Sequence, residues 1–280
     1  MRVGKKRAEI VKRSCCTQTV ATAVGISTKN IHRTGKQEAK DEQLRDAIHD
    51  LHKKHPAYGH IRISIALQVN KKRTKRVMKK YGIKPPRRKS KQFCTKSTSH
   101  HTYSNLIKEY TPLRPHDLWC SDVSFIPFQG KWWYFATIVD IVTRQIIACQ
   151  IGKHHNSKLI LATIEQAITK TKATPTIFHT DQGTEFMAQA CTSFLEGFGT
   201  KISASDKASP WQNGYQESFF GKFKDEFGDF SRFETIGELM EEIYSQIHYY
   251  NTQRIHRSLK MPPAAYAKLL SENSPPVWGT

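Results

Sequence analysis

The sequence lacks the features that mark membrane proteins, secreted proteins and small metal-stabilised domains. No apolar run in the 280 residues approaches bilayer length, and no apolar signal segment follows the basic first residues. The six cysteines form no CxxC pair, and no cysteine–histidine cluster has zinc-finger spacing. We therefore expect a cytoplasmic protein with no disulfide framework, no structural zinc site and no membrane partner.

Acidic residues are scarce in the first third of the chain. The net charge is +20, and residues 1–100 hold 27 lysines and arginines against 6 acids, whereas residues 101–280 hold 17 against 18. This asymmetry indicates a nucleic-acid-binding arm joined to a near-neutral domain. The alternative is a solvated basic tail that aids solubility. Nucleic acid is favoured because the basic residues fall within helical patterns.

The arm begins with a helix-turn-helix-like segment, which we place in residues 1–40. Residues 17–34 have the pattern of two short helices around Gly25, with Ser27 as a cap for the second. In a helix-turn-helix the second helix enters the major groove, so we expect Lys29, Asn30 and Arg33 to contact DNA. An unspecific helical hairpin is the alternative.

A second helix-turn-helix module, more basic than the first, is predicted in residues 41–90. Apolar positions predict helices over 41–54, 60–68 and 71–81. The last helix carries cations that phosphates would neutralise: Lys72, Arg73, Lys75, Arg76, Lys79 and Lys80. A plain solvated face is the alternative. Residues 91–112 follow as a basic linker, and Arg87 and Arg88, just before it, are further candidates for DNA contact.

The composition changes at Asp117, where strand and helix patterns begin to alternate. We predict strands at 118–127, 132–139, 144–151, 175–179 and 201–203, and helices at 156–171, 183–197 and 234–250. A further helix carries Phe220, Phe223 and Phe227 as a core stripe. The pattern predicts a mixed α/β domain over residues 113–272, and residues 273–280 are expected to be disordered.

Three carboxylates are the candidate catalytic residues. Asp122 lies mid-strand, Asp181 ends a buried strand before Gln-Gly, and Glu217 starts the phenylalanine-striped helix. There are 58 residues between the first two acids and 35 between the last two. Any one of them alone is more often structural. Magnesium prefers oxygen ligands, and three carboxylates from separate segments form a minimal cage for two such ions.

These acids and their flanking residues resemble the DDE transposase and retroviral integrase superfamily, and within it the IS3-type insertion-sequence transposases of bacteria. The resemblance rests on Trp119–Ile126, His179–Phe186, Pro210–Glu217 and Tyr250–Tyr266. It implies a ribonuclease H-like core and a DNA transposase that nicks element ends and joins the freed 3′-hydroxyl to target DNA. It also implies a homo-oligomer on DNA in the bacterial cytoplasm, associated with the nucleoid.

The resemblance implies roles for individual residues as well. Asp122 would bridge two Mg²⁺ ions, for which Mn²⁺ can substitute, and Asp181 and Glu217 would bind one ion each. The supporting candidates are His179, which is equally a core histidine, and Asn213. Further candidates for DNA contact are Lys224, Arg254, His256 and Arg257. Ile255 stands where the family usually has proline, and we expect this departure to change little.

Two other functions stay open at this stage. One is a two-metal nuclease of the same fold that cuts without joining. The other is an inactive relic that binds DNA as a regulator, although the presence of all three acids counts against it. A product assay for joined strands separates the transposase from the nuclease.

Overall fold

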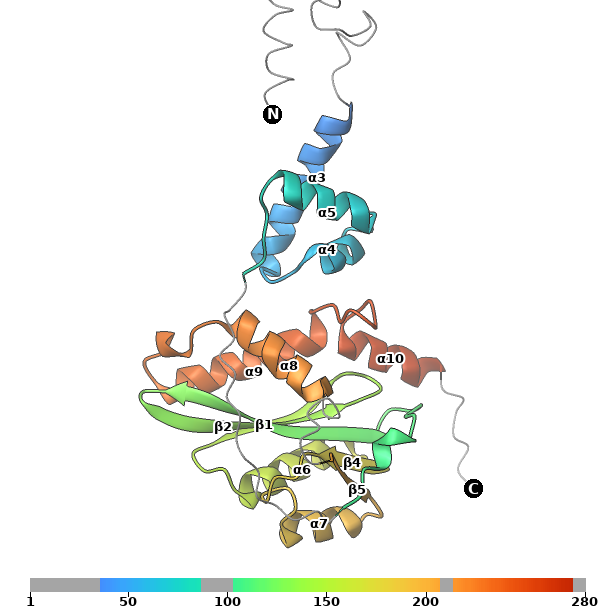
Figure 1. Cartoon of the computed structure of the whole chain (residues 1–280), viewed down its shortest axis with the longest axis vertical. Helices are drawn as coiled ribbons and strands as arrows, with labels where there is room; N and C mark the ends of the chain where they lie inside the picture. Colours follow the sequence, from blue (N-terminus) through green and yellow to red (C-terminus); the bar gives the residue numbers. More distant parts are fainter. Residues whose placement is uncertain (1–35, 87–102, 207–213, 274–280) are drawn as a thin grey trace, which may run out of the picture.

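The computed structural model describes residues 36–86, 103–206 and 214–273. They form a small helical module and a larger α/β core, which lie one above the other in Figure 1. The module consists of α3 (Lys36–Lys54), α4 (His60–Ala66) and α5 (Lys71–Lys80). None of the helices in the described ranges is both long and apolar enough to cross a membrane.

The module is held together by one small apolar cluster. Ile48, Ile63 and Val77 come from the three helices and are fully buried. The Asn70 side chain accepts hydrogen bonds from the backbone N–H groups of the first turn of α5, and Gly82 follows that helix with a φ of +69°. The predicted helix boundaries of α4 and α5 are therefore confirmed to within two residues.

Helix α3 begins five residues before the predicted start at residue 41, so the boundary drawn between residues 40 and 41 falls inside a helix. Apolar periodicity could not show this, because Gln37, Glu38 and Lys40 are all polar. Asp41 nevertheless faces inward, since both of its carboxylate oxygens accept hydrogen bonds from the Arg76 guanidinium, at 2.6 and 2.7 Å. An inward-facing ion pair leaves no apolar signal in the sequence.

The core is built on a five-stranded sheet in the order β3-β2-β1-β4-β5. Strands β1, β2 and β3 are antiparallel neighbours, whereas β4 and β5 run parallel to β1. Gln129 and Gly130, both with positive φ, form the tight turn between β1 and β2. This is the predicted ribonuclease H-like arrangement, with strands at Leu118–Phe128, Lys131–Asp140, Ile146–Gly152, Ile177–Thr180 and Lys201–Ala204.

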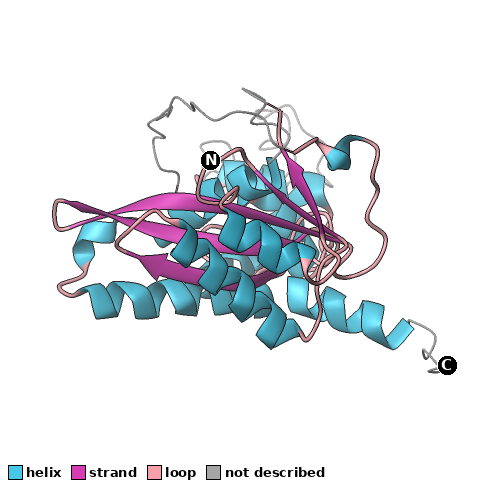
Figure 2. Cartoon of the chain, turned by 90° about the horizontal axis from the view of Figure 1, so that it is seen from below, coloured by secondary structure: helices cyan, strands magenta, loops and turns pink. Residues whose placement is uncertain are grey.

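Helices cover both faces of the sheet (Figure 2). On one face α6 (Ser157–Thr171) and α7 (Gln189–Glu196) pack against Trp119 and its neighbours. On the other face α8 (Gly214–Phe227) and α9 (Ile236–Thr252) pack against Cys120 and its neighbours. Side chains along β1 alternate between these two layers, so Asp122, two residues after Cys120, lies on the α8 side.

Two segments differ from the prediction. The helix predicted over 183–197 begins only at Gln189, because the preceding residues form the turn that follows Asp181. Residues 103–112, assigned to the linker, instead pack on the core: the Ala204 N–H donates to the Ser104 carbonyl, and Leu106 to Lys108 form a short 3₁₀ helix. Helix α10 (Pro263–Asn273) includes the first residue of the predicted disordered tail, and the prediction for residues 274–280 lies outside the described residues.

Candidate active site

Asp122 and Asp181 are brought together by the register of two parallel strands. Cys120 of β1 is paired with His179 of β4. Asp122 lies two residues further along β1, and Asp181 lies two residues after His179, directly past the end of β4. Neighbouring strands are about 5 Å apart. The two carboxylates, separated by 58 residues in sequence, are therefore neighbours at the carboxyl end of β4.

Gln216 anchors the helix that carries Glu217 to the same strand. Its side-chain amide, buried at 0% exposure, donates to the Cys120 carbonyl at 2.6 Å. Its carbonyl oxygen accepts the Thr137 hydroxyl at 3.1 Å, and Thr137 is the partner of Asp122 across β1 and β2. The first turn of α8 is thus fixed beside Asp122, with Glu217 exposed at the next position.

The other acids influence the pKa of Asp122. Burial raises the pKa of Asp122 to about 7, and the nearby charges of Asp181, Glu217 and Glu185 add to the rise. Burial also raises the pKa of Asp181, although the Gly183 N–H, which donates to it at 3.0 Å, opposes that change. Among the described residues, no three histidine, cysteine, aspartate or glutamate side chains are grouped closely enough to hold an ion. The predicted shared metal site therefore stays a prediction.

A fourth acid lies beside this site and was not among the sequence candidates. Glu185 pairs with His155 at 2.8 Å, and the His155 ring stacks on Tyr134. The bond to Glu185 raises the pKa of His155. Burial opposes ionisation of Glu185, but its bonds to His155 outweigh that effect and lower its pKa. The only sequence signal was an acid four residues after Asp181, which does not reveal a histidine partner thirty residues earlier.

His179 has the structural role that the sequence left open. Its ring is fully buried, and its two nitrogens lie 2.9 and 3.0 Å from the hydroxyls of Ser203 and Ser205. Burial lowers the pKa of His179 to about 4, so the ring is neutral at physiological pH. It joins β4 to the end of β5 and so supports the strand that presents Asp181.

The DNA-contacting residues predicted in the first ninety positions fall into three groups. The first group lies outside the described residues and consists of Lys29, Asn30, Arg33, Arg87 and Arg88. The supporting candidate Asn213 also lies outside them. The second has partners within the module: Arg73 donates to the Lys40 carbonyl, Arg76 pairs with Asp41, and Lys80 lies near Asp41 and Glu38. The third is exposed on one face of α5 and comprises Lys72, Lys75 and Lys79.

Arg254 and its neighbours join the module to the core. Arg254 is 2% exposed, and its Nε donates to Glu226 at 2.7 Å, an arrangement that favours a structural role over direct DNA contact. Arg62 of the module reaches the same carboxylate at 3.9 Å. Burial and nearby cations lower the pKa of His256 to about 4. His256 and Arg257 continue the segment into a pocket beside α8, whereas Lys224 is half-buried on that helix.

The expectation that Ile255 changes little does not hold at this junction. Its N–H donates to the Tyr58 hydroxyl at 2.7 Å, and its carbonyl accepts from Arg62 at 2.9 Å. Proline has no N–H, so it could not make the first of these bonds. Isoleucine also packs against the apolar cluster of the module. Isoleucine at this position thus allows one bond between module and core that proline would not.

Comparison with known proteins gives the family. The Integrase core domain family matches residues 112–210, and a second family with the same description matches residues 198–263. The transposase for insertion sequence element IS904 of Lactococcus lactis is 32% identical over 81% of this chain and 94% of its own length. An uncharacterized transposase-like protein of Haemophilus influenzae is 30% identical over 71% of this chain and 94% of its own length.

Among solved structures, the HTLV-2 integrase catalytic core domain in complex with magnesium aligns with 56% of this chain and 99% of its own, at 17% identity and a TM-score of 0.47. The two transposase relatives are matched over nearly their whole length, and the matched integrase core segments contain all three acids. This chain therefore belongs to the DDE transposase and integrase superfamily, as an insertion-sequence transposase of the IS3 type.

Proposed function

We propose that this transposase cuts DNA at the ends of its mobile element and joins the freed 3′-hydroxyls to a target, with Asp122, Asp181 and Glu217 as its catalytic acids. The register of β1 with β4 supports the proposal, because Cys120 pairs with His179 and each aspartate follows two residues later. The Gln216 anchor then brings Glu217 to the same edge.

The donor set fits a hard divalent cation. All three candidate ligands are carboxylates, which suit Mg²⁺ and Mn²⁺ better than softer metals. A pKa of about 7 for Asp122 also indicates a site where a cation would relieve burial and repulsion among the acids. We propose two ions, with Asp122 shared between them. When bound, such a pair stabilises the charge that develops on the attacking and leaving oxygens of a phosphoryl transfer.

Several features of the fold would hold and orient the three candidate carboxylates. Asp122 stands on β1 and Asp181 directly follows β4; the Gly183 N–H donates to Asp181, and neutral His179 supports β4. Glu217 is exposed and would turn inward to complete the cage. His155 balances the charge of Glu185 beside the acids and so limits their repulsion.

We propose Lys72, Lys75 and Lys79 as the main phosphate contacts of the helical module. They follow the i, i+3, i+7 spacing of one helix face, and within the described part of the chain no acid pairs with them. Their phosphate contacts would be sequence-independent and would weaken with salt. Because one active site must act at each of two element ends, the working complex on DNA would be a homo-oligomer.

The experiment tests nicking and joining on a duplex that carries the element's terminal inverted repeat, in the presence of Mg²⁺. The variants Asp122→Asn, Asp181→Asn and Glu217→Gln should each lose both activities by more than about a hundredfold while they still bind DNA. The matched control is Asp225→Asn, an exposed acid on the same helix as Glu217. Parental cutting without any joined product would favour the nuclease, and binding without cutting would favour the regulator.

A further inference from the structure

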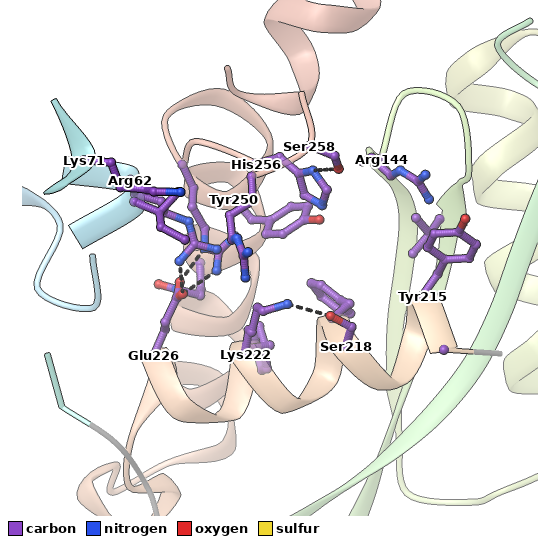
Figure 3. Close-up of a pocket in the computed structure, with 18 residues that line it drawn as sticks. Arg62, Lys71, Arg144, Tyr215, Ser218, Lys222, Glu226, Tyr250, His256 and Ser258 are labelled. Carbon is purple, nitrogen blue, oxygen red and sulfur yellow. Dashed lines mark hydrogen bonds and ion pairs between the residues drawn. The ribbon is translucent and has the colours of Figure 1, made fainter. Parts of the chain in front are cut away.

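A second site lies on the other side of α8 from Glu217. It is a pocket of about 810 Å³ between the helical module, α8 and the residues that follow α9 (Figure 3). Tyr215, Ser218, Lys222 and Glu226 line it from α8. At 100° per residue these positions lie roughly 100–180° around the helix from Glu217, so the pocket is separate from the acid site.

The pocket has a large excess of positive charge. Glu226 is the only acid among its lining residues in the described chain. The six lining cations are Arg62, Lys71, Arg144, Lys222, Arg254 and Arg257. Arg254 and Arg62 share Glu226. The other four have no acidic partner in the part of the chain that the structure describes. Like charges at this density destabilise a fold unless an anion neutralises them.

The effect of these charges is visible on their neighbours. Burial lowers the pKa of Lys222, and Arg254, Arg62 and Arg257 lower it further. Burial also lowers the pKa of His256, and Arg144 is the strongest charge that acts on it. Cations from the module, from the β2–β3 turn and from the segment after α9 therefore converge on the same space.

One end of the pocket is aromatic. Tyr215 is 48% exposed, and the Arg144 guanidinium lies 4.1 Å from the centre of its ring. Figure 3 shows this pair at the opposite end of the pocket from Lys71 and Arg62. The Arg144 Nη1 is buried and has no hydrogen-bond partner among the residues that the structure describes. A flat ring beside an unsatisfied guanidinium is the combination that binds a base together with its phosphate.

The size of the pocket limits what can enter. It falls within the range of about 300–1,000 Å³ that is typical of small-molecule sites, which suits a few nucleotides of one strand but not a duplex. We propose that this pocket binds unpaired nucleotides of a single DNA strand at the element end, with Lys222 and Arg257 on the phosphates and Tyr215 stacked on a base. The proposal rests on the proposed function and adds a second DNA site to it.

The test compares two duplexes by fluorescence anisotropy, with the full chain in metal-free buffer. Both carry the same element end, but one is blunt and the other has three additional unpaired nucleotides on one strand. The parent should prefer the extended duplex by about tenfold, because each stacked base and each phosphate contact adds affinity. Lys222→Gln should abolish this preference and flatten the salt dependence for the extended duplex by about 0.7 of a logarithmic unit per decade of salt.

Matched variants separate binding from folding. Tyr215→Ala should lose the preference and Tyr215→Phe should keep it, since phenylalanine retains the stacking ring. Lys170→Gln, at an exposed lysine of α6 on the far face of the sheet, should behave as the parent does. Thermal melts followed by circular dichroism verify that each variant is folded. If Tyr215→Ala and Lys222→Gln keep the full preference, the pocket does not bind the strand.

Inorganic phosphate is the second probe. Phosphate that raised the melting temperature of the parent but not of Lys222→Gln, together with equal binding of the two duplexes, would identify a small-anion site and overturn the proposal. Equal binding of the two duplexes leaves the transposase function intact and rejects only the pocket. Failure of the parent to bind either duplex would reject both.

Discussion

Two aspartates, one in each region of the molecule, show how differently the same side chain is used. Asp41 in the helical module has both oxygens bonded to Arg76, and that hydrogen bonding lowers its pKa to about 2 although burial opposes the shift. Asp122 in the core has other acids as neighbours, and burial raises its pKa to about 7. The first is a satisfied ion pair, whereas the second has no ion-pair partner among the described residues and accepts one bond, from the Val123 N–H at 2.7 Å.

The difference separates structural acids from catalytic ones. A fold gains nothing from holding Asp122 near Asp181 and Glu217, because their charges disfavour ionisation of Asp122. Such an arrangement is expected where a ligand supplies the missing charge. The pocket behind α8 likewise groups like charges, but these are positive, since its lining cations outnumber the single lining acid. Glu226, at the junction of the two regions, belongs to the structural class.

The largest effect is expected at this junction. Glu226→Gln leaves Arg254, which is 2% exposed, as a buried cation without its partner, and also releases Arg62. Removing one member of a buried pair costs about 3–5 kcal/mol, so the melting temperature should fall by several degrees. Glu217→Gln, half a turn away on the opposite face of α8, is the control and should melt at or above the parent's temperature. Equal melting temperatures for the two variants would remove the distinction between structural and catalytic acids.

A smaller effect on stability, with a clear effect on activity, is expected at Gln216. Gln216→Met leaves the Cys120 carbonyl and the Thr137 hydroxyl without their buried partner, at a cost of about 1–3 kcal/mol. Strand transfer should fall by about 10–100-fold, because Glu217 loses the anchor that holds its helix turn beside Asp122.

The double variant Thr137→Val/Gln216→Met separates positioning from folding. Removing both partners of the hydroxyl bond should recover part of the stability, while strand transfer stays low. Gln189→Met, at an exposed glutamine of α7, should leave both properties unchanged. If activity returned together with stability in the double variant, Gln216 would be a packing residue only.

The sequence predicted the elements of the core well because apolar periodicity reports burial directly. The strands and most helix boundaries agree with the structure, and so do the positions of Asp122 on β1 and Glu217 on α8. The early start of α3 was missed because a polar first turn and an inward-facing Asp41 carry no apolar signal. Periodicity likewise could not show that residues 103–112 pack on the core.

The candidate site was predictable only in part, for a physical reason. Flanking motifs and the family resemblance identified three acids, but side-chain partners depend on which segments become neighbours in the fold. His155 reaches Glu185, and Gln216 reaches Thr137, across separations that no local pattern encodes. Arg254 was predicted to contact DNA, yet in the structure its guanidinium donates a hydrogen bond to the Glu226 carboxylate. Charge in a sequence shows that a partner is needed but does not identify it.

The ion pair of the module should contribute less than the junction does. Asp41→Asn removes the charge that Arg76 and Lys80 share, and should destabilise the module by about 1–2 kcal/mol, because Arg76 is half exposed and solvent screens the pair. A folded-state pKa below the unfolded value gives stability that is present above pH 4 and lost as the pH falls towards 2. The difference between variant and parent should therefore shrink over that window in thermal melts. A constant difference from pH 7 to pH 2 would contradict the assignment.

Asp122→Asn should change stability by a similar amount, but in the opposite direction. The folded-state pKa of Asp122 is raised from 3.8 to about 7, so the native chain retains a proton that the unfolded chain has already lost. The parent must therefore lose stability as the pH rises from about 4 to 7, and the uncharged amide must not. Above pH 7 the variant should be more stable than the metal-free parent by roughly 1–2 kcal/mol, after solvent screening of a half-buried carboxylate, and below pH 4 the two should melt alike.

Magnesium provides the counter-test, because a bound cation stabilises the ionised acids. It should raise the melting temperature of the parent by mass action and that of Asp122→Asn much less, which reverses their order at pH 8. Asp140→Asn is an unsuitable control because Asp140 caps the turn after β2, whereas Asp225→Asn changes an exposed acid and should show neither effect. If Asp122→Asn were less stable than the parent at pH 8 without metal, Asp122 would have a compensating partner and would resemble Asp41 after all. Repulsion among the three acids would then not be what separates the core from the module.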